Sequence, residues 1–469
     1  MREQEVAESV NFSSEMRYLR VDYDSSHQID YALTPIFILL ITACPGYLLP
    51  MNRIRSSLSI LAASLLALFS IGCGSGGSNN EPSNPDIRIG ALLNLSGPYN
   101  GNDQLVYSAL YQATQDAQTS LGVTVAIDAL DTRGEPDFAV QQFQSLLDKG
   151  IKVVVGPSTS GEAQAVLPLA NAAGALLVSE SSTAQSLAIP NDALYRLSPT
   201  NIVQSQAVVD LMALQGRRSL ITVNREDLGN QEEATSVRQF ASQRGFSLQP
   251  AITYPTSAWT DFDGVVNQIV SATERASAGG VEQVAIFIAG FDEVANLLAA
   301  CSTYETLNNY SFYGSDGTAQ NTQITSSARP AYFAVEADSF PSPLLSVPAN
   351  QAERAQQITA AIGGTNPNGF ALNGYDAVLI MTNAYLNDPQ FSSGGIQTRQ
   401  AFVKAAQGYQ GVTGVIQLNS AGDRITADYS FWGVCYLNGL TNWYSVGHWT
   451  PASPTSQRGT ASFSGCPVE

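Results

Sequence analysis

The segment IKVVVGPSTSGEAQAVLPLANAAGALLVSESST, residues 151–183, is the most informative stretch for the fold. It contains two short apolar runs, at 152–155 and 175–178, separated by a stretch of helical length. Short apolar runs of this kind are typical of buried strands. A strand, a helix and a second strand in this order predict two parallel strands joined by a crossover helix.

The same alternation continues on both sides of this segment. Further apolar runs are typical of strands, at 87–93, 123–129, 219–223, 248–253, 283–288 and 310–313. Helical stretches are expected between the later runs, at about 229–244, 260–277 and 292–304. We therefore predict an α/β protein with two doubly wound, Rossmann-like lobes. In such sheets ligands bind beyond the carboxyl ends of the strands.

Bulk composition narrows the function. The chain has 469 residues, which suits two domains with tails better than one core. Its 40 acidic and 22 basic residues give a net charge of -18, so a nucleic-acid partner is not expected. The sequence shows no nucleophile–base pair, phosphate loop or metal-ligand cluster, and has only two histidines. We expect no enzymatic activity, no cofactor and no metal.

Residues 51–73, MNRIRSSLSILAASLLALFSIGC, have the form of an export signal. Arg53 and Arg55 precede an apolar run at 58–69 that is too short for a permanent membrane span. Small residues then lead to Cys73. The pattern resembles a bacterial lipoprotein signal, which implies removal of 51–72 and lipid attachment to the Cys73 sulfur. An uncleaved anchor is the alternative.

Two neighbouring segments follow from this interpretation. Residues 1–50 have no place before a signal that begins at Met51, so we expect them to result from a start codon assigned too early. A competing apolar run, at 36–44, follows acidic rather than basic residues. Residues 73–86 are rich in Gly, Ser, Asn and Pro and predict a flexible tether between the membrane and the folded body.

Four strand ends carry residues that could hold a small ligand. Ser160 begins a helix, where it can cap the free amides or bind an anion together with them. Ser181 and Thr183 offer hydroxyls after the next strand, and a plain turn explains them equally well. Asp316 can pair with an ammonium or belong to an Asp-Gly turn. Tyr99 can form an aromatic wall, or lie in a surface turn.

The order of these segments closely resembles the type I periplasmic binding proteins, specifically the branched-chain amino-acid-binding group. The resemblance covers about 87–436. It is carried by the 151–183 segment and by five further motifs in family order: IRIGALLNLSGPYNG (87–101), TDFDGVVNQI (260–269), YGSDGTAQ (313–320), NGYDAVLIMTNAY (373–385) and VTGVIQLNSAGD (412–423).

The resemblance implies roles for individual residues. Ser160 matches the serine that binds the ligand α-carboxylate, and Ser181 matches a residue whose backbone contacts the ligand. Thr183 matches the threonine between the carboxylate and the ammonium, and Asp316 the acid that pairs with the ammonium.

The chain also departs from the family pattern. Leu228 stands where an aromatic residue is expected, and Phe291 keeps a ring but lacks the hydroxyl. The headgroup site is therefore expected to be retained, while the specificity for the ligand side chain is not defined.

The same resemblance implies a hinge of three crossings, near Pro199, Asp316 and Leu418. It gives an N-terminal lobe of 87–199 and 315–415, a C-terminal lobe of 200–314 and 416–450, and a tail of 451–469. With Cys73 lipidated, an exported chain could pair Cys435 with Cys466. Cys301 lies in a predicted helix and is expected to be a buried free thiol.

We expect a lipid-anchored, extracytoplasmic solute-binding protein, in the periplasm or on the cell surface. It would pass an amino acid or similar small molecule to the permease of an ABC transporter. A sensory or regulatory lipoprotein of the same fold is a second possibility, because one fold can serve several functions. A structural or enzyme-activating lipoprotein with an inactive pocket is a third.

Overall fold

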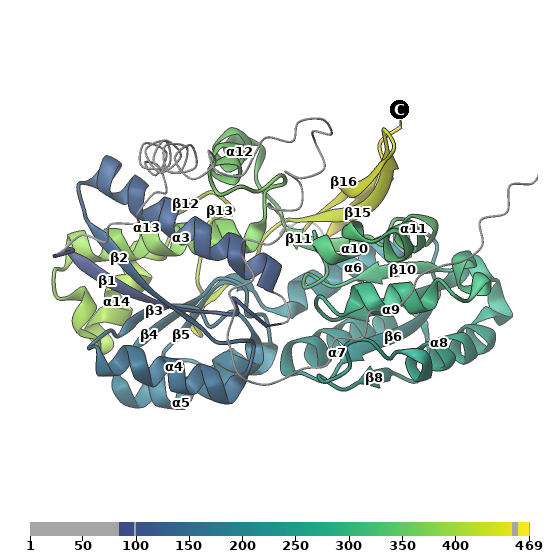
Figure 1. Ribbon diagram of the computed structural model, residues 1–469, viewed down its shortest axis with the longest axis horizontal. Helices are drawn as coiled ribbons and strands as arrows, with labels where there is room; N and C mark the ends of the chain where they lie inside the picture. The colour runs from purple at the N-terminus through teal and green to yellow at the C-terminus, as the bar shows by residue number, and fades with distance from the viewer. Residues whose placement is uncertain (1–83, 98–99, 453–457, 469) are drawn as a thin grey trace, which may run out of the picture. The chain divides into compact units, whose positions relative to one another are not determined.

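The computed structural model describes residues 84–97, 100–452 and 458–468 (Figure 1). The predicted signal at 51–72, the lipidation site Cys73 and the candidate ligand residue Tyr99 lie outside these ranges. Within the described ranges, no helix combines the length and the apolar composition that a membrane crossing requires.

The first sheet is parallel and has the strand order β14-β5-β4-β3-β1-β2. Its strands are β1 (Ile87–Leu93), β2 (Val125–Asp131), β3 (Val153–Val155), β4 (Leu176–Ser179), β5 (Leu194–Pro199) and β14 (Asp423–Arg424). Helices α3 (Asn100–Leu121) and α13 (Gly369–Asn387) lie on one side of it, and α4 (Pro136–Asp148) and α5 (Ser160–Ala173) on the other (Figure 1).

Both faces of this sheet are buried, and β1 shows why. Its Ile89, Ala91 and Leu93 belong to the core cluster that contains residues of α3 and α13. Leu92 belongs to a different cluster, with residues of α4 and α5. Successive side chains of a strand point to opposite faces, so a nearly continuous apolar run is what a doubly covered strand requires.

The second sheet has the order β10-β9-β6-β7, and β8 pairs with β6. Its strands are β6 (Ser219–Arg225), β7 (Ser247–Leu248), β8 (Ile252–Tyr254), β9 (Val284–Ala289) and β10 (Ser311–Gly314). Helices α6 (Asn201–Leu214) and α7 (Leu228–Gln243) share a core cluster with one face, and α8 (Asp263–Ala276) and α9 (Val294–Cys301) with the other. The fold class predicted from the sequence is confirmed.

Two strands differ from the expectation. The strand predicted at 248–253 is divided into β7 and β8, because Pro250 has no backbone N–H to donate to a ladder. Strand β5 was not predicted, since Arg196 interrupts its apolar run. That arginine is fully buried, and its Nε atom lies 2.6 Å from Oδ1 of Asp423 on the neighbouring β14.

An antiparallel sheet, also not predicted, follows in the C-terminal part. It contains β11 (Ser342–Leu345), β15 (Tyr429–Leu437), β16 (Leu440–Thr450) and β17 (Thr460–Phe463). The β15–β16 hairpin turns at Asn438 and Gly439, both with positive φ, which is the backbone that an Asn-Gly hairpin turn needs. Part of the expected tail at 451–469 is therefore an ordered strand.

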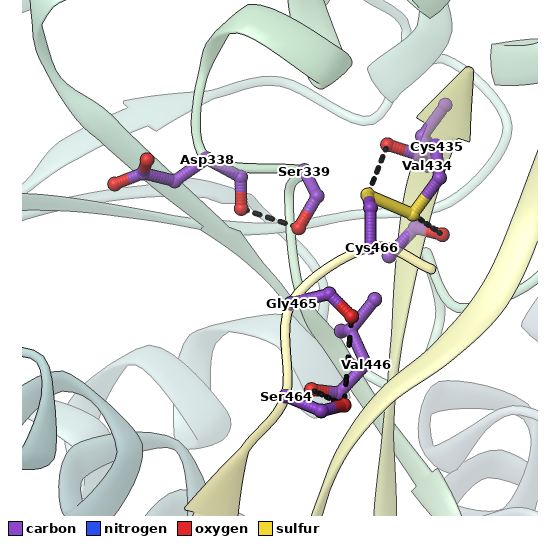
Figure 2. Close-up of a disulfide and its surroundings, with 9 residues drawn as sticks. Asp338, Ser339, Val434, Cys435, Val446, Ser464, Gly465 and Cys466 are labelled. Carbon is purple, nitrogen blue, oxygen red and sulfur yellow. Dashed lines mark hydrogen bonds between the residues drawn. A yellow bond between two sulfur atoms is a disulfide. The ribbon is translucent and has the colours of Figure 1, made fainter. Parts of the chain in front are cut away.

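A disulfide between Cys435 and Cys466 joins β15 to the segment after β17 (Figure 2). Next to it, the backbone nitrogen and the hydroxyl of Ser464 both donate to the Val446 carbonyl on β16, at 2.8 and 3.0 Å. Cys301, the free cysteine among the described residues, is fully buried on α9.

The packing of two connecting segments differs from the expected lobe bounds. Helices α10 (Thr322–Ser326) and α11 (Ala328–Glu336) contact α9, although 315–415 was assigned to the N-terminal lobe. Strand β14 pairs with β5 of the first sheet, although 416–450 was assigned to the C-terminal lobe. Sequence pattern does not show on which sheet a connecting segment packs, and the lobe bounds stay a prediction.

The remaining elements complete the layer around α13. Helices α12 (Ala352–Ala361) and α14 (Ile396–Ala406) contact α3 and α13, respectively, and β12 (Gln410–Gly411) forms a short hairpin with β13 (Gly414–Val415).

Candidate functional site

Segments that follow strands of both sheets line one small cavity, which we call the cleft cavity. Its volume is about 30 Å³. The lining residues are Ser158, Thr159, Ser160, Ser181, Thr183, Asp227, Gly229, Asn230, Glu233, Phe291, Asp316, Gly317 and Phe370. Five of the seven ligand residues expected from the sequence are in this set: Ser160, Ser181, Thr183, Phe291 and Asp316.

Ser160 is the first residue of α5, but it is not the cap of that helix. Thr159 is the cap: its hydroxyl accepts from the Glu162 nitrogen, and the Glu162 carboxylate accepts from the Thr159 nitrogen at 3.2 Å. Of the two roles considered for Ser160, capping of α5 is therefore excluded, because the preceding hydroxyl already caps the helix. Thr159 and Glu162 have the spacing of a capping box, so the sequence contained this signal.

The Ser160 hydroxyl instead connects two loops. Its oxygen accepts hydrogen bonds from the backbone nitrogens of Thr183 and Ala184, at 3.2 and 3.1 Å. It also lies 3.1 Å from the Ser182 hydroxyl. The loop after β3 and the loop after β4 are thus held together at the edge of the cleft cavity.

Ser181 reinforces the same connection, since its hydroxyl donates to the Ser158 carbonyl at 2.8 Å. The Thr183 carbonyl accepts from the Asn201 nitrogen at 2.7 Å, which fixes this loop against the start of α6. Both residues are buried, with 8% and 7% of their surface exposed. These hydrogen bonds therefore hold the loop that carries the Ser181 and Thr183 hydroxyls in place.

Asp316 follows β10 and brings a carboxylate to the same cavity. Burial raises the pKa of Asp316 to about 6, while the Gln204 side chain and the Gly317 backbone nitrogen oppose this shift. A cationic group bound beside Asp316 would favour the ionised form and lower its pKa again.

The first two turns of α7 contribute three polar residues that the sequence interpretation missed. Asp227 caps α7, because its Oδ1 accepts from the Asn230 nitrogen at 3.2 Å and its Oδ2 from the Asn230 side chain at 2.7 Å. Glu233 is only 2% exposed, and burial raises its pKa well above the usual value. The three residues are three positions apart, a spacing that places them on one helix face and was visible in the sequence.

Of the remaining two candidate residues, Leu228 is not among the lining residues given above, and Tyr99 is not described. Leu228 lines a neighbouring cavity of about 780 Å³, together with Arg225 and the ring of Phe291. The Arg225 guanidinium lies 5.2 Å from the centre of that ring. Phe291 thus lines both cavities, whereas Leu228 lines the neighbouring one, and Tyr99 lies outside the described residues.

Comparison with known proteins agrees with this arrangement. The family described as periplasmic binding protein matches residues 86–431. The chain is 26% identical over 385 residues to an uncharacterized protein of Methanocaldococcus jannaschii, a match that covers 77% of this chain and 89% of that one.

Two solved structures show the same fold. A leucine-binding protein from Thermotoga maritima has 17% identity and a TM-score of 0.64, over 76% of this chain and 98% of that one. An ABC-transporter solute-binding protein from R. palustris, solved with benzoate, has 16% identity and a TM-score of 0.63, over 76% and 95% of the two chains. Because the family match spans well over half of the sequence, this chain belongs to the type I periplasmic binding proteins, a family of extracytoplasmic solute-binding proteins rather than enzymes.

Proposed function

We propose that this protein captures an amino acid or an amino-acid-like molecule in the cleft cavity and delivers it to the permease of an ABC transporter. The observation that carries the proposal is that groups suited to an anion and a group suited to a cation line the same cavity. Hydroxyls and a helix start, at Ser160 and Thr183, suit a carboxylate. The carboxylate of Asp316 suits an ammonium.

The carboxylate side is built from the start of α5. The first amides of a helix have no partners within the helix and carry a partial positive charge, which favours an anion. Thr159 and Glu162 satisfy part of this demand by the capping box, and the hydroxyls of Ser160 and Thr183 lie next to it. A ligand carboxylate placed here would accept hydrogen bonds without needing a cationic side chain.

The acidic residues of the cavity should distinguish amino acids from simple carboxylic acids. One structural relative was solved with benzoate, which has a carboxylate and no ammonium. The described residues that line the cleft cavity include Asp227, Asp316 and Glu233 but no lysine or arginine. An ionised Asp316 without a cationic neighbour among these residues repels an anionic ligand, so the site favours a molecule with an ammonium group.

Entry of such a ligand requires the cleft to open. A volume of about 30 Å³ holds no more than a few water molecules, which is far less than an amino acid needs. The cavity is lined from both sheets, so a ligand that contacts residues of both would stabilise the closed arrangement.

We further propose that the mature protein begins at a lipidated Cys73. Mass spectrometry of the protein from membranes of its native host tests this point. The expected result is an N-terminal Cys73 peptide with an attached lipid, and an intact peptide from residues 1–50 would contradict it.

A thermal-shift screen against amino acids and small carboxylic acids tests the proposed ligand class. A ligand present at 100 times its dissociation constant should add about 2.7 kcal/mol to the free energy of unfolding. We expect this response from at least one amino acid. A response to aromatic or aliphatic acids, with none to any amino acid, would contradict the proposal.

A further inference from the structure

Glu233 is a buried acid whose place in the cleft cavity the amino-acid headgroup does not explain. It lines the cavity, is 2% exposed, and its Oε1 atom has no hydrogen-bond partner among the described residues. Burying an ionisable group without a partner is costly. A residue of this kind at a binding site indicates that its partner arrives with the ligand.

The other two acids of the cavity have partners. Asp227 accepts two hydrogen bonds from Asn230, and its Oδ2 lies 3.8 Å from the Arg225 guanidinium. Asp316 is the proposed partner of the ligand ammonium. Glu233 and Asp316 are close enough to interact electrostatically, and burial together with that interaction raises the pKa of Glu233. One zwitterionic headgroup leaves one acid of this pair unpaired.

We expect the positive charge that pairs with Glu233 to be carried by the ligand. The described residues of the lining include no lysine, arginine or histidine. A metal ion is disfavoured by geometry, since no three acidic, histidine or cysteine side chains of the described ranges converge closely enough to hold one. A second amine on an organic ligand is the remaining source of positive charge, and it can also donate hydrogen bonds to Glu233.

We propose that Glu233 is a specificity-determining residue that binds a second amino group, so that the ligand is a diamino acid or a similarly cationic amino-acid-like compound. This inference rests on the proposed function, because it takes the headgroup to lie between Ser160 and Asp316. It specifies the class of ligand side chain, which the departures from the family pattern at Leu228 and Phe291 leave undefined.

The test is calorimetry with matched pairs in which one amine is replaced by a methyl group. Suitable pairs are 2,4-diaminobutyrate with norvaline, ornithine with norleucine, and lysine with 2-aminoheptanoate. We expect the wild-type protein to bind at least one diamino acid tenfold or more tightly than its apolar counterpart. Glu233→Gln should remove this ratio while changing the affinity for the apolar counterpart by less than threefold.

Glu274→Gln is the matched control, because Glu274 is an exposed glutamate on α8, and it should keep the wild-type ratio. Equal or tighter binding of the apolar member in the wild-type protein would overturn the inference. So would an equal loss for both members in Glu233→Gln, which would mean that Glu233 shares the α-ammonium with Asp316. If no amino acid of any kind binds, the proposed function fails and the inference fails with it. The wild-type ratio decides the question even if Glu233→Gln does not fold.

Discussion

The hydroxyl oxygen of Ser160 accepts a hydrogen bond from the backbone nitrogen of Thr183 at 3.2 Å, and this bond connects the loops that follow two neighbouring strands. The two residues are 23 positions apart in the sequence. They meet because β3 and β4 are parallel neighbours, so their carboxyl ends lie at the same edge of the sheet. The polar groups of the site are thereby positioned before any ligand arrives.

Replacing Ser160 by alanine should weaken both the fold and ligand binding. The buried backbone nitrogens of Thr183 and Ala184 would lose their acceptor, at a cost of about 1–3 kcal/mol in the free energy of unfolding. We also expect amino-acid affinity, measured by calorimetry, to fall at least tenfold. Ser145→Ala, an exposed serine on α4, is the control and should change neither quantity. Unchanged affinity in Ser160→Ala would exclude Ser160 from the ligand site.

The buried carboxylate of Asp376 should make stability depend on pH. Burial raises the pKa of Asp376 to about 7, against an ordinary value of 3.8, although the Val412 nitrogen donates to its Oδ2 at 2.8 Å. Between these values the folded protein keeps a proton that the unfolded chain releases. The contribution of Asp376 to stability is therefore lost as pH rises from about 4 to about 7.

Asp376→Asn removes this titration, and an asparagine can still accept from Val412. Relative to the wild-type protein, its free energy of unfolding should rise by a few kcal/mol between pH 4 and pH 8, as measured by urea denaturation. Asp148→Asn, an exposed aspartate at the end of α4, should show no such trend. A constant difference between Asp376→Asn and wild type across this pH range would contradict the expectation.

The ion pair of Arg196 and Asp423 should be important for stability because both side chains are fully buried, at 0% and 1% exposed. Asp423→Asn would leave the guanidinium without its counter-charge and should cost about 3–5 kcal/mol. Asp128→Asn provides the contrast, since Asp128 pairs with the exposed Arg88 and Lys149 and should cost about 1 kcal/mol or less. Similar losses from the two substitutions would show that burial of the first pair has no energetic consequence.

The disulfide of Cys435 and Cys466 should stabilise the C-terminal sheet. In the chain-entropy model, a bridge across 31 positions contributes about 3.7 kcal/mol by restricting the unfolded chain. The double replacement of both cysteines by serine should lower the free energy of unfolding by this amount, and a reducing agent should then have no further effect. A continued response to the reducing agent would show that the bridge is not its target.

The sequence predicted the layered α/β fold because buried parallel strands are nearly continuous apolar runs. It did not predict β5, where Arg196 is neutralised by Asp423 from a distant segment. The C-terminal sheet was also missed, although the Asn-Gly pair at 438–439 marks its central hairpin.

The candidate site was predicted where motif and strand end coincide, as at Ser160 and Asp316. Glu233 was missed because a single glutamate on a helix is usually exposed, and only its packing makes it a lining residue. Leu228 was placed in the site by its position in a family motif; in the structure it lines the neighbouring cavity, and its contact with a ligand stays a prediction.

Calorimetry on Asp316→Asn tests the central claim most directly, with the amino acid that gives the largest thermal shift in the screen as the titrant. Removing one partner of a buried, charge-assisted contact typically costs 2–5 kcal/mol, so we predict an affinity loss of about 30-fold or more. Binding of that amino acid within threefold of the wild-type affinity would show that Asp316 does not hold its ammonium group, and would contradict the account.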